Sequence, residues 1–316
     1  MSIKIPEKAE TVHTLDLNFL GLHGVIAAYL IPHAQGAILI ESGPGSTLPG
    51  LQAGLQDLGM SVQDITDLFV THIHLDHAGA GGWLARQGTQ IHVHPAGAPH
   101  LLDPEKLLSS ATRIYGDKMD LLWGEFLPVP VERLSVMEHN QVFEVGGVKI
   151  RALDTPGHAN HHLAYVCNGI CFSGDVGGVR LAGYRHLRLP TPPPEFHLET
   201  WRQSLKLLQD EFGRGSFTRL APTHFGIFQD TDWHLAALEG TLDEIEQWVL
   251  TNLPAEPSFE QLNAQFLEWT RQRSLAQGLQ NSDFDAYEAA NPSWMSPQGI
   301  QRYWRKYRKD VEKANR

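Results

Sequence analysis

The feature that most constrains this chain is a short histidine-rich loop that follows an apolar segment. Directly after the apolar residues 68–70, the sequence places His72, His74, Asp76 and His77 within six positions. A buried strand ending at residue 70 would deliver all four side chains into one loop. Neutral imidazole and carboxylate groups are ligands for zinc, iron or manganese, and a histidine-rich surface turn is the alternative interpretation. The loop therefore predicts a metal site at the end of a strand.

Three further candidate ligands each follow a predicted strand. His158 comes after alternating apolar residues, Asp175 closes a predicted hairpin over 164–172, and His224 follows the short apolar run 219–221. A lone histidine is usually a structural residue, but loops at strand ends are where a rigid scaffold presents functional groups. Because every one of these motifs occupies such a loop, we expect them to meet at one site.

The rest of the pattern indicates an α/β chain with two related halves. Residues 28–43 and 164–175 share an Ala-Tyr pair, an apolar strand, a glycine turn, a second strand and an acidic, glycine-rich exit. A leucine-rich helical insertion is expected over about 96–127. We expect residues 1–228 to form the catalytic domain and residues 229–316 to form a C-terminal helical layer packed on it.

Composition narrows the function classes. The 316 residues include 25 Lys and Arg against 36 Asp and Glu, a net charge of −11, which argues against a nucleic-acid partner. No apolar run approaches about 18 residues, so no membrane segment is expected, and residues 1–8 lack the apolar core of a signal peptide. Cys167 and Cys171 sit one register out of opposition in the predicted hairpin and are expected as free buried thiols. We therefore expect a cytoplasmic enzyme that acts on a small molecule.

Together, these motifs resemble the metallo-β-lactamase-fold hydrolases. The shared pattern is His-x-His-x-Asp-His, then Gly-His, then Gly-Asp, then a final His, and it covers about residues 13–228. The resemblance implies a four-layer αββα sandwich, here with a C-terminal helical extension. It also implies two metal ions, the first held by His72, His74 and His158, and the second by Asp76, His77 and His224, with Asp175 bridging both.

Some positions depart from the family pattern or extend it. The family often has Asp-Thr-Gly on the loop where this chain has Glu-Ser-Gly from position 41, and Glu41 would orient a ligand without touching the metal. His162 lies where thioesterase-like members carry a histidine and is expected in a similar supporting position, whereas His161 is expected only in packing. Because His74 stands where the flavodiiron branch has glutamate, the resemblance points away from dioxygen chemistry.

The chemistry that the resemblance implies is metal-assisted hydrolysis. Two divalent ions, foremost zinc with manganese or iron as alternatives, would share a bridging hydroxide and polarise the scissile carbonyl. Asp76 would hydrogen-bond this hydroxide and pass a proton to the leaving group. No Gly-x-Ser-x-Gly motif offers a serine nucleophile. Similarity to the lactonase and hydroxyacylglutathione hydrolase branches implies a small ester, lactone or thioester as substrate.

Two segments are candidates for contacting that substrate. The insertion could fold over the metals as a lid whose Tyr115 and Trp123 line an apolar pocket, or it could be a helix pair that only packs on the sandwich. After Asp175, the chain carries Tyr184 and His186 on a loop near the expected metal site.

Three alternatives stand beside the hydrolase. A persulfide dioxygenase shares the fold and uses a single iron ion, a phosphodiesterase of the same fold cleaves phosphate esters, and an inactive descendant would bind metal alone. Tryptophans on the C-terminal helices also suggest a homodimer face, made by Trp248, Trp269, Trp294 and Trp304.

Overall fold

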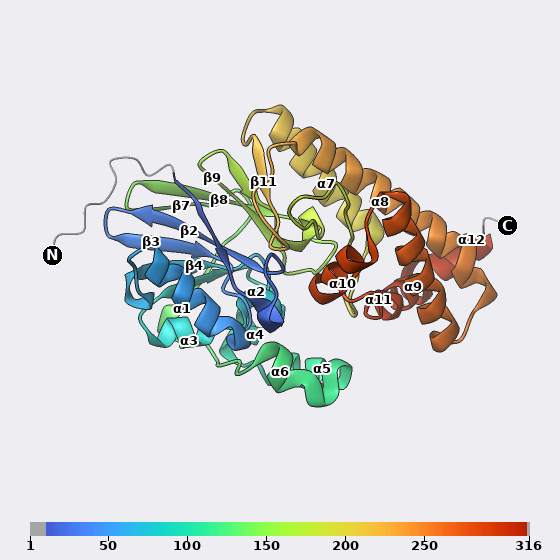
Figure 1. The fold of residues 1–316 in the computed structure, drawn as a ribbon, viewed down its shortest axis with the longest axis horizontal. Coiled ribbons are helices and arrows are strands. Elements are labelled where there is room, and N and C mark those ends of the chain that lie inside the picture. The colour runs from blue at the N-terminus through green and yellow to red at the C-terminus, as the bar shows by residue number, and fades with distance from the viewer. Residues whose placement is uncertain (1–10, 315–316) are drawn as a thin grey trace.

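Two β-sheets pack face to face and helices cover both outer faces (Figure 1). The computed structural model describes residues 11–314, so the prediction for the N-terminal residues 1–8 lies outside the described chain. The first sheet has six strands in sequence order: β1 (His13–Asp16), β2 (Ala27–His33), β3 (Gly36–Ile40), β4 (Ile65–Phe69), β5 (Gln90–Val93) and β6 (Leu134–Val136). The second has the order β11 (Arg219–Ala221), β10 (Ile170–Phe172), β9 (Leu163–Cys167), β8 (Val148–Asp154) and β7 (Val142–Val145). The predicted α/β class and αββα layering are confirmed.

The central strands are apolar on both faces because each face packs on a different layer. In β2, Tyr29 and Ile31 join the apolar cluster between the two sheets, while Ala28 and Leu30 join the cluster under the outer helices. Burying each such large side chain contributes about 1.5–3 kcal/mol. The Tyr29 hydroxyl also donates to the carbonyl of Pro222, so the first sheet contacts the loop that follows β11.

Helices of the first half cover the outer face of the six-stranded sheet. Their apolar sides share one buried cluster with that face, for example through Leu51 and Leu55. These helices are α1 (Leu48–Asp57), α2 (Leu75–Ala78), α3 (Gly81–Arg86), α4 (Ala98–Leu102), α5 (Glu105–Tyr115) and α6 (Met119–Trp123). The last three occupy the predicted insertion at 96–127, and Figure 1 shows α5 and α6 extending below the sandwich.

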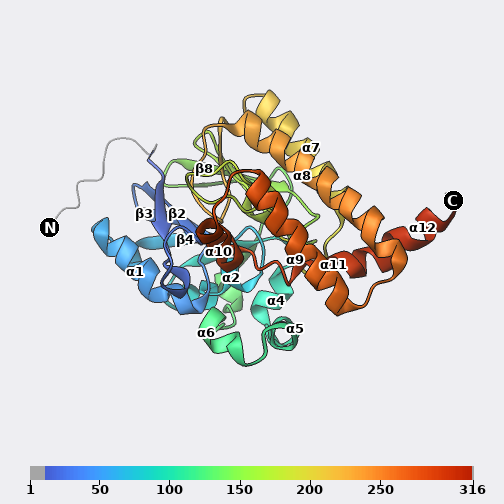
Figure 2. The same ribbon diagram turned by 45° about the vertical axis from the view of Figure 1, so that its right-hand side comes forward.

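Helices of the second half cover the five-stranded sheet and continue to the C-terminus (Figure 2). One apolar cluster joins this sheet to α7, α8, α9 and α11, so these helices pack on the same body as the sandwich. The predicted boundary at residue 228 falls just before α8. The elements are α7 (Leu198–Gly213), α8 (Thr231–Asn252), α9 (Phe259–Ala276), α10 (Asn281–Ala290), α11 (Ser296–Tyr303) and α12 (Lys309–Ala314).

Strand direction brings the candidate ligands to shared edges. β3 and β4 are parallel, so the loops that leave them begin at the same end of the first sheet. β8 and β10 are each antiparallel to β9, and β10 is parallel to β11, so all three run the same way and end at one edge. Ligands placed after β8, β10 and β11 can therefore meet.

Two further sequence predictions concern cysteines and membranes. Cys167 and Cys171 are buried and free, as expected. Of the helices that the structure describes, none has both the length and the apolar character needed to cross a bilayer.

Candidate metal centre

The histidine-rich loop turns its ligands inward through one short helical turn. After β4 the chain bends at Thr71 and His72, His74 has an extended backbone, and α2 then begins at Leu75. The amide of His77 donates to the carbonyl of His74 at 3.0 Å, which closes the turn. His72 and His77 are fully buried, whereas Asp76 is partly open to the cavity above. The loop thus directs His72, His74, Asp76 and His77 into two neighbouring groups of ligand atoms.

The first group of ligand atoms is three imidazole nitrogens. Nε2 of His72 lies 2.9 Å from Nδ1 of His74 and 3.2 Å from Nε2 of His158, and the last pair, His158 Nε2 and His74 Nδ1, is 2.9 Å apart. Nitrogen ligands of a tetrahedral zinc ion lie about 3.3 Å apart. The triangle therefore has nearly the edge length that one bound cation requires.

The second group combines one carboxylate with two imidazoles. Oδ2 of Asp76 lies 3.6 Å from Nε2 of His77 and 3.4 Å from Nε2 of His224. These three atoms, like those of the first group, lie within 4.8 Å of one another. His224 reaches this position from the second sheet, where it lies in the loop that follows β11.

Asp175 lies between the two groups. Its Oδ2 is 3.3 Å from Nε2 of His158, while its Oδ1 is 3.3 Å from Nε2 of His77 and 3.8 Å from Nε2 of His224. The preceding Gly174 has a φ of 51°, and a Cβ there would meet the ring of His162 at 2.6 Å. Glycine at this position is what lets the Asp175 backbone approach the histidine cluster.

The residues fit a metal ion on grounds that do not depend on resemblance. Among the described residues, Nε2 of His77 and Oδ1 of Asp175 are buried and have no hydrogen-bond partner. A buried polar atom without a partner is unfavourable, and here both atoms point at the same space. Imidazole nitrogens with carboxylate oxygens are the donor set of zinc and of similar divalent ions. All seven predicted ligands therefore converge in an arrangement suited to two cations.

The two ligand groups differ in the protonation of their histidines. Burial lowers the pKa of His72 well below its ordinary value, and the nearby His77 and His74 lower it further. Burial also lowers the pKa of His158. For Asp175, burial raises the pKa, but His77 and His158 outweigh it and hold the pKa well below the usual range. Burial lowers the pKa of His77, but Asp175 and Asp76 outweigh it and raise this pKa well above its ordinary value. Burial likewise lowers the pKa of His224, but the hydrogen bond to Asp76 raises it above the ordinary value. A cation bound by the second group would therefore displace protons from these two rings.

Glu41 orients a ligand from the loop that follows β3. Its Oε1 accepts a hydrogen bond from Nδ1 of His77 at 2.9 Å and one from the Thr223 hydroxyl at 3.0 Å. Glu41 has a φ of 65°, a left-handed conformation that costs a non-glycine residue about 1–3 kcal/mol. Such strain persists where surrounding contacts demand it, and here they hold the carboxylate against the ring of His77.

Backbone carbonyls orient two other rings. Nδ1 of His158 donates to the carbonyl of Pro190 at 2.8 Å, and Nδ1 of His224 donates to the carbonyl of Val25 at 2.8 Å. Both bonds direct Nε2 toward the cluster. These two carbonyls had no signal in the sequence, because any residue type offers one.

The other candidate side chains fall into two classes. His162 is buried beside the cluster and bonds Thr155 through Nδ1 at 2.8 Å, while His161 packs against His72 and turns its Nε2 toward Glu195 at 3.4 Å. Tyr184 and His186 are not brought to the cluster. They bond Asp283 and Gln277 of the C-terminal region instead.

A cavity of about 380 Å³ opens above the cluster. Asp76, Asp175 and His224 line its floor, and α5 with residues 288–295 line its sides. The contribution of residues 288–295 was missed in the sequence. The break at Asn291-Pro292 marks a loop between helices, but nothing local shows where that loop packs.

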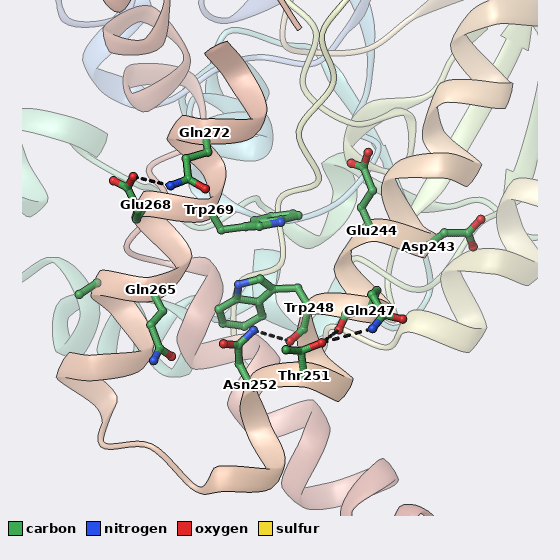
Figure 3. A pocket seen from close by; sticks show the side chains of 11 residues that line it. Asp243, Glu244, Gln247, Trp248, Thr251, Asn252, Gln265, Glu268, Trp269 and Gln272 are labelled. Carbon is green, nitrogen blue, oxygen red and sulfur yellow. Dashed lines mark hydrogen bonds between the residues drawn. The ribbon is translucent and has the colours of Figure 1, made fainter. Parts of the chain in front are cut away.

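A second, larger hollow of about 990 Å³ lies between α8 and α9, away from the histidines (Figure 3). Trp248 and Trp269 line it, but none of the predicted ligands does. Trp248 and Trp304 are buried within the chain, while Trp294 is 42% exposed and lines the first cavity instead. A homodimer through these tryptophans stays a prediction.

Several known proteins resemble this chain in sequence. The archaeal protein ST1585 of Sulfurisphaera tokodaii, described as a metallo-beta-lactamase fold-containing protein, is 29% identical over 200 residues, which are 62% of this chain and 72% of that protein. An atrochrysone carboxyl ACP thioesterase of Aspergillus fumigatus is 24% identical over 184 residues, 57% of this chain. The match spans only 34% of that thioesterase, and a lactamase-like protein of Emericella nidulans is matched over 38% of its length.

Solved structures match over more of the chain. The crystal structure of ST1585 superposes with a TM-score of 0.63 at 18% identity, covering 93% of this chain and 99% of that one. The metallo-beta-lactamase family protein TTHA1429 from Thermus thermophilus gives 0.62 at 19% identity and covers 93% of both chains. At these identities the likeness concerns the fold alone. A family model described as the metallo-beta-lactamase superfamily matches residues 23–211, more than half of the sequence, and the chain therefore belongs to that superfamily.

Proposed function

We propose that the protein is a dinuclear metal-dependent hydrolase of a small ester, lactone or thioester. The observation that carries the proposal is the position of Asp175, whose two oxygens face the two ligand groups at 3.3 Å from His158 and 3.3 Å from His77. A carboxylate so placed can hold two cations a short distance apart, as hydrolases with two-metal sites do. Members of the superfamily are mostly hydrolases, which supports the reaction class.

When bound, two divalent ions would lower the pKa of a shared water toward 7 and polarise the scissile carbonyl. The chain supplies the remaining functions. Although burial raises the pKa of Asp76, His77 lowers it to about 2, so this carboxylate is ionised and can accept a hydrogen bond from water in the cavity. Glu41 holds the His77 ring in place through Nδ1. The apolar walls exclude bulk water, which strengthens the electrostatic interactions inside.

Thioesters are the first substrates to test. A fungal relative carries the name of a thioesterase, and that name supports the same bond type here as a proposal. Neither cysteine is available as a nucleophile, because both are buried, neither lines the cavity, and burial raises the pKa of the Cys167 thiol to about 12.

The deciding experiment is elemental analysis of protein purified without chelators, followed by hydrolysis assays on thioester, lactone and aryl ester panels. We expect close to two equivalents of zinc or manganese per chain. Chelation should abolish turnover, and readdition of metal should restore it. One equivalent of iron, together with oxygen consumption in the presence of glutathione persulfide, would instead identify a dioxygenase and contradict the proposal.

A further inference from the structure

The cavity above the metal ligands is covered by two segments that lie outside the sheets. Ala111, Ile114 and Tyr115 of α5 form one wall, and residues 288–295, where α10 ends and the chain leads into α11, form the other. The Tyr115 hydroxyl donates to Sδ of Met295 at 3.0 Å, so the two walls meet above the ligands.

The walls are aromatic and aliphatic. Tyr115 contacts the ring of Trp123 with centroids 5.0 Å apart and that of Trp294 at 6.0 Å, and Phe19 stacks on Trp123 at 5.8 Å. Such a surface gains free energy by covering an apolar group, in proportion to the area it removes from water.

Charged side chains on the walls are few and already engaged. Glu288 accepts hydrogen bonds from the guanidinium of Arg188 at 2.6 Å and from the amide of Ser293 at 2.9 Å. Lys118, which is exposed, is the single lysine or arginine among the described lining residues. Apart from the metal ligands on its floor, which include Asp76 and Asp175, the described lining of the cavity therefore presents no buried, unpaired charge to an apolar ligand.

The size of the cavity limits which part of a substrate it can hold. Its volume of about 380 Å³ is at the small end of the range for ligand pockets, which is about 300–1,000 Å³. An acyl chain or a single aromatic ring system fits such a space. A protein carrier does not, so a leaving group of that size must lie toward solvent.

We infer that this cavity binds the apolar acyl group of the substrate, with the carbonyl at the metal ligands and the leaving group directed outward. The inference rests on the proposed function and specifies its substrate class. It also assigns acyl selection partly to residues 288–295, which lie beyond the region matched by the family model at 23–211.

Chain length provides the test. We expect kcat/KM for p-nitrophenyl esters of the metal-loaded protein to rise about fourfold for each added methylene from acetyl to about octanoyl, because each buried methylene contributes to transition-state binding. Varying the alcohol portion at constant acyl length should have a much smaller effect. A flat acyl profile, or a stronger dependence on the alcohol, would overturn the inference.

A variant that fills the cavity sharpens the test. Ala289 lines the wall and is half-buried, so Ala289→Trp should reduce the octanoyl-to-acetyl ratio of kcat/KM about a hundredfold. Ile114→Ala enlarges the opposite wall and should move the optimum to longer chains, which keeps the test open if the tryptophan variant does not fold. The matched control is Leu121→Trp on α6, since Leu121 is 67% exposed and lies outside the cavity lining. An unchanged ratio in folded Ala289→Trp would contradict the inference.

A ligand that cannot be hydrolysed separates this inference from the proposed function. Nonan-2-one should bind the protein, measured by calorimetry, much more tightly than propanone, and Ala289→Trp should reduce this difference about a hundredfold. Ketone binding without any ester hydrolysis would support the apolar pocket while the hydrolase proposal failed. Ester hydrolysis without preference for the longer ketone or the longer acyl chain would contradict the pocket assignment but not the proposed hydrolase activity.

Discussion

The two halves of the molecule share a topology but supply metal ligands in different ways. In the first half, β2 and β3 form an antiparallel hairpin and β4 adds in parallel; in the second, β9, β10 and β11 repeat this arrangement. The first half provides four ligand residues from the single loop after β4. The second provides His158, Asp175 and His224 from three loops, each after a different strand.

This difference shows which ligand positions depend on local sequence and which depend on tertiary structure. The spacing of the first four ligands depends on one short turn, whereas the second three depend on the pairing of β8, β9, β10 and β11. Each ligand group nevertheless draws on both halves, since His158 joins His72 and His74, and His224 joins Asp76 and His77. The following predictions test whether the halves contribute equally, from the largest expected effect to the smallest.

Replacing the residue that spans both groups should have the largest effect. Asp175→Ala removes the only carboxylate that faces both ligand groups among the described residues, and we expect loss of metal from both and a fall in kcat/KM on the order of a thousandfold or more. Metal analysis and esterase assays measure the two effects. The matched control is Asp154→Ala, because Asp154 ends β8 but faces His94 at 3.4 Å instead of the cluster. Full metal content and activity in Asp175→Ala would refute the bridging assignment.

Within the first ligand group, the ligand from the first half of the molecule and the ligand from the second half should be equally important for metal binding. His74→Ala and His158→Ala should each remove about one metal equivalent and lower kcat/KM by similar factors, on the order of a hundredfold or more, because both nitrogens belong to the same triangle. His161→Ala serves as the control, since its ring packs on His72 but its Nε2 faces Glu195. A loss in His161→Ala as large as in His158→Ala would mean that the wrong histidine has been assigned.

A smaller effect is expected for the group that orients His77. Glu41→Gln keeps the size of the side chain but weakens the bond to Nδ1, so metal affinity should fall about 10–100-fold. Competition with a fluorescent chelator measures this affinity. Glu195→Gln is the control, because Glu195 contacts His161 and not a ligand. Equal metal affinity in the Glu41 variant and the wild type would show that Glu41 serves only the fold.

The smallest effect is expected for a loop residue that lies away from the cavity. Tyr184→Phe should leave kcat/KM unchanged, since the hydroxyl donates to Asp283 at 2.6 Å and does not line the cavity. Tyr115→Ala is the contrasting variant and should lower kcat/KM for long acyl esters, because Tyr115 joins the two walls. A loss of activity in Tyr184→Phe would show that this loop contributes to the substrate site.

Much of the site could be predicted from local signals. The two candidates that lie away from the metal ligands, Tyr184 and His186, were predicted for a common reason. The apolar runs that end at histidine or aspartate located every residue that converges at the centre, and the Glu-Ser-Gly at position 41 located the carboxylate against His77. Tyr184 and His186 lie close to Asp175 in sequence, which suggested the same site. Instead, Tyr184 bonds Asp283 of α10, and His186 bonds Gln277 in the loop before that helix.

The sequence by itself determined the layered class of the fold, the strands buried on both faces and which histidines and aspartates converge. These features can be predicted from short stretches of sequence, because periodicity, turn residues and ligand types each involve only a few positions. Only the tertiary structure decided that residues 288–295 close the cavity against α5 and that the carbonyls of Val25 and Pro190 orient two ligand rings. Contacts of this kind join segments far apart in the chain, and their energy comes from packing geometry, which no single stretch of sequence records.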